Sequence, residues 1–370
     1  MGVNVTCYAD DTLVTAYSTN YREAAERATD GVSEVVRRIK ALGLEVALQK
    51  SEAIVFHGPR KGPPRNSKID VGGASIAVRP WLKYLGLVLD SRWTFHEHFR
   101  RLAPRLVAAA GSLGRILPNI GGPGGTCRRL YAGVIKSMAL YGAPIWAGTL
   151  RPQTAVLLRR PQRTMALRMA RAYRTVSFEG ACVLAGVPPW DLEAEALAAV
   201  YRRRARARNE DQIEPPQSII DVWRSNAEAE VLEVWRDRCH NPGATRELVS
   251  AIQPVLEEWV NRKFGPLTYR LTQMLTGHGC FGRYLCQVAR REPTSVCHHC
   301  EDGVEDSAQH TRQVCPAWME PRAALVEVIG PNLSLPALIQ AMTTEERAWR
   351  VNVSLILELN SESKQWRRVL

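Results

Sequence analysis

The sequence lacks any apolar run close to the roughly 20 residues that a membrane-spanning helix needs. It also lacks the charged and then apolar N-terminal segment that is typical of a signal peptide. We therefore expect an intracellular protein with no membrane partner. Its nine cysteines are an odd number, which argues against a secreted scaffold of paired disulfides. In a reducing compartment we expect these cysteines to be free thiols or metal ligands.

Acidic residues are also in short supply, because 37 Asp and Glu stand against 49 Lys and Arg, for a formal net charge of +12. An excess of this size favours a polyanionic partner, since neutralising phosphates releases counterions. The alternative is an ordinary soluble protein that happens to be basic. With 370 residues, 45% of them hydrophobic, the chain is long enough for two or more domains with their own cores.

Two adjacent carboxylates lie near the start of the sequence, in the segment Tyr8-Ala9-Asp10-Asp11. The flanking residues are rich in β-branched side chains, so the sequence predicts two strands joined by a tight turn that carries the acids. Mg²⁺ usually takes one or two carboxylates plus substrate phosphates, and two ions about 4 Å apart serve nucleotidyl transfer. The alternative is a polar turn without a metal, because Asp is common in turns.

Hydrophobic spacing divides the rest of the chain into strands and helices. An amphipathic helix is predicted over residues 21–42. Residues 44–56 predict a strand, a turn and a strand, and a further strand pair follows, with 81–90 as its second strand. From about residue 96 the pattern is helical. The predicted helices in this part run over residues 100–117, 127–141 and from about 191 to 208.

The order of hairpin, helix and strand pairs resembles the palm of a reverse transcriptase, more narrowly that of the R1-like, type-1 non-LTR retrotransposons of insects. The segment Tyr8-Ala9-Asp10-Asp11 matches the family's active-site motif. Later segments resemble the family's thumb and C-terminal region in the same order, so the resemblance covers nearly the whole chain. These segments are Leu130 to Trp146, Ala172 to Ser177 and Leu275 to Gly279.

The resemblance implies an RNA-directed DNA polymerase, a nucleotidyltransferase that acts in target-primed reverse transcription and has an associated endonuclease in the full-length parent. It implies that Asp10 and Asp11 hold Mg²⁺ (or Mn²⁺). It also places Lys50 near the incoming triphosphate. The implied catalytic residues are Asp10, Asp11 and Lys50, and those near the primer or nucleotide are Tyr8, Lys83 and Gly86.

In this family the fingers, the other catalytic aspartate and the endonuclease domain would precede residue 1, so we expect a C-terminal fragment of a polyprotein. One carboxylate pair cannot hold two metals, and the fragment is therefore expected to bind nucleic acid without polymerase activity. The alternative is a zinc-containing nucleic-acid-binding module from a truncated or domesticated element. The implied partners are element RNA, target DNA, deoxynucleoside triphosphates and the missing N-terminal portion, with action in the nucleus.

A second motif, Cys297-x2-Cys300-x9-His310-x4-Cys315, has the spacing of a zinc site. Three thiolates and one imidazole close a tetrahedron without an open position, so the ion would be structural. By geometry alone His298 or His299 could replace His310, but both lie between the cysteines, where the chain turns. The same order of ligands resembles the family's C-terminal zinc motif.

Between Arg151 and Phe178 the sequence has seven arginines and no acid. A helix of this kind can pack one side and offer the other to a phosphate backbone, or its basic face can simply meet water. A second cluster, residues 202–208, is a candidate localisation patch, phosphate contact or stabiliser of its helix C-terminus. The predicted nucleic-acid contacts are Arg159, Arg160, Arg163, Arg168, Arg171, Arg174, Arg203 and Arg204.

The sequence thus predicts an α+β protein: a partial reverse-transcriptase palm of β-hairpins plus a helix, then a mostly α-helical thumb and connector, and a small zinc knuckle. The polar segment 209–217 predicts a linker. The expected domains are residues 1–91 (palm, the C-terminal part of the reverse-transcriptase domain), 92–210 (helical thumb and basic connector) and 218–370 (nucleic-acid-binding, endonuclease-associated by resemblance), with the knuckle at 297–315. His278, Cys280 and Cys286 have no assigned role.

Overall fold

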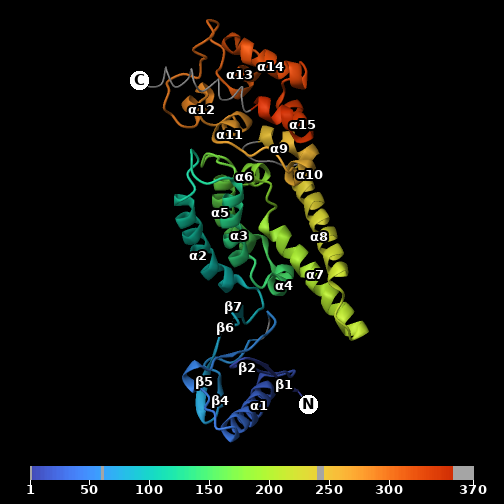
Figure 1. Ribbon diagram of the computed structural model, residues 1–370. Coiled ribbons are helices and arrows are strands. Elements are labelled where there is room, and N and C mark those ends of the chain that lie inside the picture. The colour runs from blue at the N-terminus through green and yellow to red at the C-terminus, as the bar shows by residue number, and fades with distance from the viewer. Residues whose placement is uncertain (1, 60–61, 240–245, 353–370) are drawn as a thin grey trace. The chain divides into compact units, whose positions relative to one another are not determined.

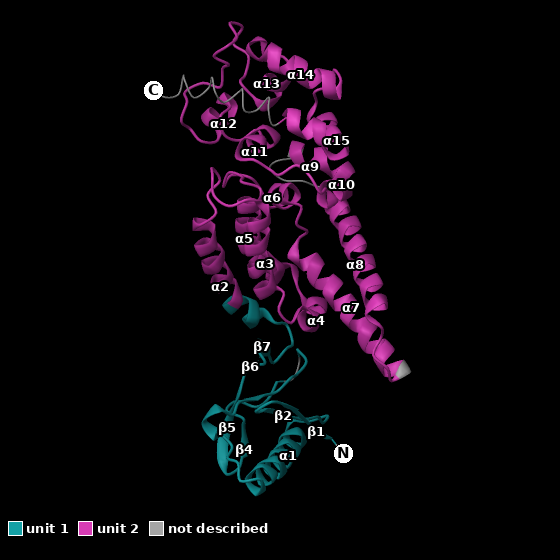
Figure 2. Ribbon diagram, viewed as in Figure 1, with its two compact units in different colours: residues 1–101 teal, residues 102–370 magenta. Residues whose placement is uncertain are grey.

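The computed structural model describes residues 2–59, 62–239 and 246–352, and these form an α+β structure in which helices dominate (Figure 1). The chain divides into two compact units, residues 1–101 and 102–370 (Figure 2). Within the described residues, no helix combines the length and the apolar character that crossing a membrane requires.

The described residues of the first unit form three small sheets. One is the antiparallel hairpin of β1 and β2, and another is the antiparallel hairpin of β6 and β7. In the third, β5 lies between β4, which is antiparallel to it, and β3, which is parallel. The strands are β1 (Val3–Tyr8), β2 (Asp11–Ala16), β3 (Ala53–Ile54), β4 (Lys68–Val71), β5 (Ala74–Arg79), β6 (Trp81–Tyr84) and β7 (Leu87–Asp90).

Helix α1 (Tyr21–Ala41) packs against both the β1–β2 hairpin and β4. It begins where the Asn20 side chain accepts a hydrogen bond from the Glu23 N–H at 2.9 Å, as an N-cap does. A Cβ at Gly31 would lie 2.6 Å from Cγ1 of Val3, so the glycine lets the helix approach the hairpin closely. The helix predicted over residues 21–42 is confirmed.

The strand predicted directly after this helix is wrong. Residues 44–47 are not paired, and the next regular element is the short 3₁₀ helix Leu48–Lys50, before the two-residue strand β3. The reason is local hydrogen bonding: the Leu44 N–H donates to Ile39 in the last turn of α1, and the Lys50 N–H donates to Ala47. Backbone donors satisfied in this way are not free for a sheet ladder.

The expected single strand over 81–90 is two strands, β6 and β7, joined by Leu85 and Gly86. Both turn residues have positive φ, +44° and +84°, which suits the two-residue hairpin turn that matches strand twist. The segment from Lys83 to Gly86 therefore forms the second half of one strand and the turn itself.

The second unit is helical in its described part. Helix α2 (His96–Arg115) begins within the first unit and continues into the second. The predicted helices over 100–117, 127–141 and 191–208 are confirmed as α2, α3 and α7 with slightly shifted ends. The other elements of this unit include α3 (Gly125–Ala139), α4 (Ala143–Trp146), α5 (Pro152–Met169), α6 (Phe178–Ala185), α7 (Trp190–Asp211), α8 (Gln217–Arg238), α9 (Arg246–Ile252), α10 (Leu256–Asn261), α11 (Tyr269–Thr276), α12 (Gly282–Gln287), α13 (Ala308–Gln313), α14 (Met319–Ile329) and α15 (Leu335–Thr344).

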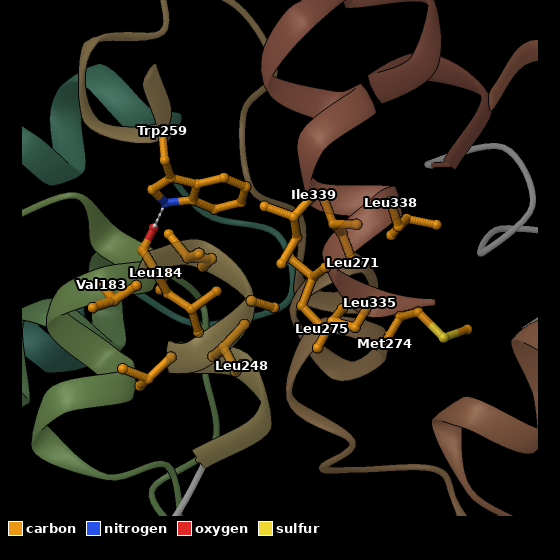
Figure 3. Close-up of a cluster of buried hydrophobic side chains, with 14 of the residues drawn as sticks. Val183, Leu184, Leu248, Trp259, Leu271, Met274, Leu275, Leu335, Leu338 and Ile339 are labelled. Atoms are coloured by element: carbon orange, nitrogen blue, oxygen red, sulfur yellow. Dashed lines mark hydrogen bonds between the residues drawn. The ribbon is translucent and has the colours of Figure 1, made fainter. Parts of the chain in front are cut away.

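One hydrophobic core includes buried residues of helices from α5 to α15, though none of α12, and Figure 3 shows part of it. Trp259 is fully buried in it and donates from Nε1 to the Leu184 carbonyl at 3.3 Å. The predicted linker 209–217 is largely the turn between α7 and α8, two helices that pack side by side. Helices on both sides of this turn contribute to the same core, and the three-domain division stays a prediction.

Candidate metal and nucleic-acid sites

The paired carboxylates lie at the end of the β1–β2 hairpin, as predicted. Tyr8 pairs with Asp11, so Ala9 and Asp10 form a two-residue connection, and Ala9 takes a positive φ of +52°. Asp10, Asp11 and Tyr8 are all exposed, Tyr8 to 65%. Because α1 packs on the hairpin, both carboxylates project from a supported turn into open space.

The structure does not complete a two-metal site around these acids. Lys50 ends the 3₁₀ helix and Lys83 lies in β6, both exposed, and among the described residues no hydrogen bond or ion pair joins either lysine to Asp10 or Asp11. Nor does any group of three potential metal ligands in the described ranges include these acids. Two ions need more carboxylate oxygens than one Asp pair offers, so the residues present do not fit the pair of ions that the chemistry requires.

The predicted zinc ligands, in contrast, come together in the second unit. The ligand atoms of Cys297, Cys300, His310 and Cys315 all lie within 4.8 Å of one another. The Sγ of Cys315 is 3.9 Å from that of Cys297 and 4.0 Å from that of Cys300, and Nε2 of His310 is 3.4 Å from Cys300 Sγ. A tetrahedron with zinc–sulfur bonds of about 2.3 Å has sulfur–sulfur edges of about 3.8 Å. The four atoms therefore fit a zinc ion.

Short-range backbone contacts bring the first two cysteines into place. Val296 pairs with Glu305 in an isolated antiparallel bridge, and the Cys297 N–H donates to the Val304 carbonyl at 2.7 Å. Gly303, with φ +67°, supplies the left-handed residue of the returning turn. Cys297 and Cys300 thus lie on one tight loop closed by this bridge.

Helix α13 positions the other two ligands. The Ser307 hydroxyl accepts from the His310 N–H at 3.1 Å and caps the helix. The Cys315 N–H then donates back to the His310 carbonyl at 3.0 Å, which turns Cys315 toward the imidazole. A capped helix of one and a half turns therefore explains the x4 spacing.

The environment of these thiols favours a bound cation. Cys297 and Cys315 are buried, and burial raises the pKa of Cys297 to about 12 and also raises that of Cys315. Three thiolates this close would repel one another in an apolar surrounding unless a metal compensates their charge. With four protein ligands no position is left for a substrate or water, so such an ion would be structural.

Among the three histidines, His310 is the one that lies with the cysteines. His298 and His299 are exposed, and the His299 ring meets Trp318 edge-on at 5.5 Å instead of pointing into the cluster. His310 is buried and directs Nε2 to the thiols, while its Nδ1 is buried without a hydrogen-bond partner among the described residues. The sequence prediction of His310 agrees with this arrangement.

The residues without an assigned role lie outside the cluster. His278 Nδ1 is 2.9 Å from the Thr175 hydroxyl and its ring stacks on Tyr284, while burial lowers the pKa of the imidazole. Cys280 is half-buried, and the half-buried Cys286 thiol donates to the Pro293 carbonyl at 3.7 Å. These contacts are those of a packed network between α12 and the loop after α5.

Two of the predicted nucleic-acid arginines donate to backbone carbonyls. Arg163 donates from Nε to Val176 at 2.9 Å, which fastens the loop after α5. Arg171 donates to Asn119, Gly121 and Pro123 at 3.1, 2.8 and 3.1 Å and so fastens the loop before α3. Their donors are therefore largely occupied within the protein.

The remaining predicted contacts are more open. Arg159 lies 5.6 Å over the Phe178 ring, and Arg168 is half-buried. Arg204 forms an ion pair with Glu214. Arg160, Arg174 and Arg203 are exposed residues whose side chains could reach a phosphate. A nucleic-acid role for all eight arginines stays a prediction.

Sequence reasoning missed Arg128 in α3, which is 1% exposed. Its guanidinium donates from Nε to Pro123 at 3.0 Å and from one terminal nitrogen to Arg168 at 2.6 Å. It also reaches the carbonyls of Leu117, Pro118 and Gly121. The available signal was an arginine just after a Gly- and Pro-rich loop, whose carbonyls have few other donors.

Comparison with known proteins finds several similar proteins, all from R1 retrotransposable elements. A retrovirus-related Pol polyprotein from type-1 retrotransposable element R1 4 of Nasonia vitripennis is 26% identical over 362 residues, 89% of this chain and 88% of that protein. The Pol polyprotein from element R1 of Bradysia coprophila is 28% identical over 87% of this chain, and a putative 115 kDa protein in element R1DM of Drosophila melanogaster is 26% identical over 86%.

The chain spans 32% and 31% of the length of the last two relatives. No protein-family model matches the chain, and no solved structure matches it. The similarity to R1 elements that the motifs indicated is therefore confirmed by sequence comparison alone.

Proposed function

Because this chain is an R1-like sequence, similar over most of its length to type-1 retrotransposon Pol polyproteins, we propose that it is the nucleic-acid-binding part of a reverse transcriptase that acts in target-primed reverse transcription. The observation that carries the binding role is the closed Cys297–Cys300–His310–Cys315 cluster in a chain of net charge +12. The proposed partners are element RNA and target DNA, and the proposed place of action is the nucleus.

In this proposal each group of residues has a separate task. The four ligands hold zinc, which supplies a fixed cross-link between the loop at 297–300 and α13. The exposed arginines beside α5 and on α7 attract the phosphate backbone and position it without reading sequence. Asp10 and Asp11 would contribute one carboxylate pair to Mg²⁺ binding in a polymerase site, with Tyr8 beside the primer and Lys50 near the triphosphate.

The 370-residue chain on its own is expected not to extend a primer on an RNA template with Mg²⁺ or Mn²⁺. The reason is that the described residues bring no third carboxylate to Asp10 and Asp11. The measurement is incorporation of labelled deoxynucleotides by the purified chain, with Asp10→Ala as the control. Extension that disappears in Asp10→Ala would show that the site is complete after all.

The binding role is tested with labelled single-stranded RNA. We expect affinity to fall steeply with salt, with a slope of log affinity against log salt of about −0.7 for each phosphate contacted. Affinity should also weaken after zinc is removed by a chelator and recover when zinc is restored. Binding that responds to neither salt nor chelator would contradict the proposed roles of both the arginines and the cluster.

A second candidate is a zinc-containing nucleic-acid-binding module that serves no polymerase. The incomplete carboxylate site favours it. It predicts the same binding results, but no activity when the chain is combined with the remainder of an R1 Pol polyprotein. Primer extension by that combination, lost with Asp10→Ala, would favour the polymerase.

A further inference from the structure

We propose that a cationic cavity at the start of α3, formed with the loop after α10, binds one phosphate group of a polynucleotide backbone. This proposal rests on the proposed nucleic-acid binding, but it concerns residues outside the predicted arginine sets, except for Arg171. The cavity has a volume of ≈ 260 Å³. That is below the roughly 300–1,000 Å³ of pockets for drug-sized ligands, so it suits a small group better than a whole nucleotide.

The charge of the cavity is of one sign. Four cationic side chains line it and, among the described residues that form its wall, there is no acid to neutralise them. Like charges gathered without counter-ions are costly, and an anion between them removes that cost. The four cationic residues are Arg129, Arg171, Arg262 and Lys263.

Arg262 is held rigidly in this wall. Its guanidinium lies 4.1 Å over the Trp259 ring and 5.0 Å from the Trp349 ring, and it donates to the Trp259 carbonyl. Burial, together with the nearby charge of Arg129, lowers its pKa to about 10. The group stays charged at neutral pH, and its orientation is fixed before any ligand arrives, which reduces the entropic cost of binding.

The loop that carries Arg262 and Lys263 is itself fixed by packing. Gly265 has φ +74°, and a Cβ there would lie 2.2 Å from the Trp349 ring. Only glycine allows both the backbone conformation and this close approach. The loop therefore rests directly on the tryptophan that also contacts Arg262.

The N-terminus of α3 lies at the same cavity. This 15-residue helix begins after Gly124 without any side-chain cap, so its first N–H groups are not satisfied by a capping side chain. Gly125 lines the cavity, and a Cβ added to it would meet no atom within 4 Å. A helix N-terminus without a side-chain cap, at a cavity that four cations line, is the arrangement that binds phosphate.

Two arginines hold the loop before α3 in place. Arg171 lines the cavity, but it donates hydrogen bonds to the carbonyls of Asn119, Gly121 and Pro123 in this loop. Arg128 donates to the Pro123 carbonyl as well. These bonds fix where α3 begins. Arg129, Lys263 and the α3 N-terminus are left to contact a ligand, and Arg262 lines the same cavity.

The first test removes the exposed cations. The double variant Arg129→Ala/Lys263→Ala is compared with Arg105→Ala/Arg115→Ala, which removes the same charge from exposed positions on α2. With a fluorescein-labelled oligouridylate, we expect about tenfold weaker binding for the first pair and a salt slope smaller by about 0.7, the share of one phosphate. Equal affinity and slope for the two double variants would overturn the proposal.

The second test removes a single backbone donor. Gly125 is the first residue of α3, where proline is compatible with a helix, and Gly124 before it has the extended conformation that a following proline requires (φ −66°, ψ 174°). Gly125→Pro is therefore expected to fold and to bind the oligouridylate roughly tenfold more weakly, since it loses one charge-assisted bond. Gln217→Pro makes the same kind of change at the first residue of α8, outside the cavity, and should bind as the unchanged chain does. Equal binding by the two proline variants would contradict a backbone contact to phosphate.

Inorganic phosphate distinguishes the sources of the anion. In a thermal shift assay at constant ionic strength, phosphate should stabilise the unchanged chain slightly and the Arg129→Ala/Lys263→Ala variant less. If phosphate acts in this way while all variants bind the oligouridylate equally, the cavity takes a free phosphate and the polynucleotide proposal is wrong. If the unchanged chain does not bind the oligouridylate at all, the proposed nucleic-acid function fails instead.

Discussion

Replacing Cys315 with serine is expected to abolish zinc binding and to unfold the region around the cluster. Cys315 is fully buried, and its Sγ lies within 4.0 Å of the other two sulfurs. A structural zinc ion contributes an apparent free energy of about 10–16 kcal/mol in small zinc-finger peptides, comparable with the whole stability of a typical domain. The measurements are zinc content of the purified chain and the rate of limited proteolysis.

The consequences should extend beyond the knuckle. Cys297, Cys315 and Trp318 belong to the same hydrophobic core as Leu338 and Ile339 of α15 (the latter two are shown in Figure 3). Loss of the cross-link exposes one edge of that core. We therefore expect the free energy of unfolding of the second unit to fall as well. A zinc knuckle that folds independently of its neighbours would not have this effect.

Matched variants separate loss of metal from loss of a cysteine. Cys286→Ser changes a half-buried thiol outside the cluster and should keep about one zinc per chain. His310→Ala should lose the ion, whereas His310→Cys should retain it because four thiolates also make a structural zinc site. His299→Ala should have no effect on zinc content. Full zinc content in Cys315→Ser and His310→Ala would show that these residues are not ligands.

The Cys₃His cluster and the carboxylate hairpin could be predicted from sequence because both depend on short-range geometry. Two cysteines separated by two residues lie on one turn, and His310 and Cys315 are joined by a single helix end. In the same way, Tyr8 and Asp11 are close because a two-residue connection forces it. Such sites need no knowledge of distant parts of the chain.

The arginines show where prediction from sequence ends. Arg163 and Arg171 share a stretch without acids, and this pattern indicates a surface for phosphates. Arg171, however, donates to carbonyls some 50 residues earlier in the chain, and only the packing of α3 against α5 brings the two together. An arginine that donates to backbone carbonyls in this way helps to hold the fold together. The spacing of residues in the sequence does not show which carbonyls will lie near it.

The same limit explains the missed strand boundary. Residues 44–47 have a strand-like composition, but the Leu44 N–H completes the end of α1 by bonding to Ile39. Helix-end hydrogen bonds compete with sheet pairing for the same donors, and composition alone does not say which prevails. Over residues 81–90 the error was the opposite one, because one strand was expected where the structure has two strands and a turn. Leu85 takes a positive φ in this turn, and a leucine gives no turn signal in the sequence.

Replacing Arg128 with methionine is expected to be the most destabilising single change among the arginines. Methionine approximates its volume, but the carbonyls of Leu117, Pro118 and Arg168 would lose the guanidinium as a donor, and a buried unsatisfied polar group costs about 1–3 kcal/mol. Because several carbonyls share the loss, we expect about 3–5 kcal/mol in the free energy of unfolding. At about 2–4 °C per kcal/mol, the midpoint of thermal unfolding should fall by roughly 6–20 °C.

The adjacent residue supplies the control, since Arg129→Met makes the same substitution at an exposed position of the same helix and should change stability little. Arg128→Lys is the informative third variant. One ammonium cannot reproduce a planar fork that spans the loop before α3 and the end of α5. Lysine should therefore recover only a small part of the loss. If Arg128→Lys is as stable as the unchanged chain, its positive charge matters and the fork does not, and the account of how this loop fixes the start of α3 is wrong.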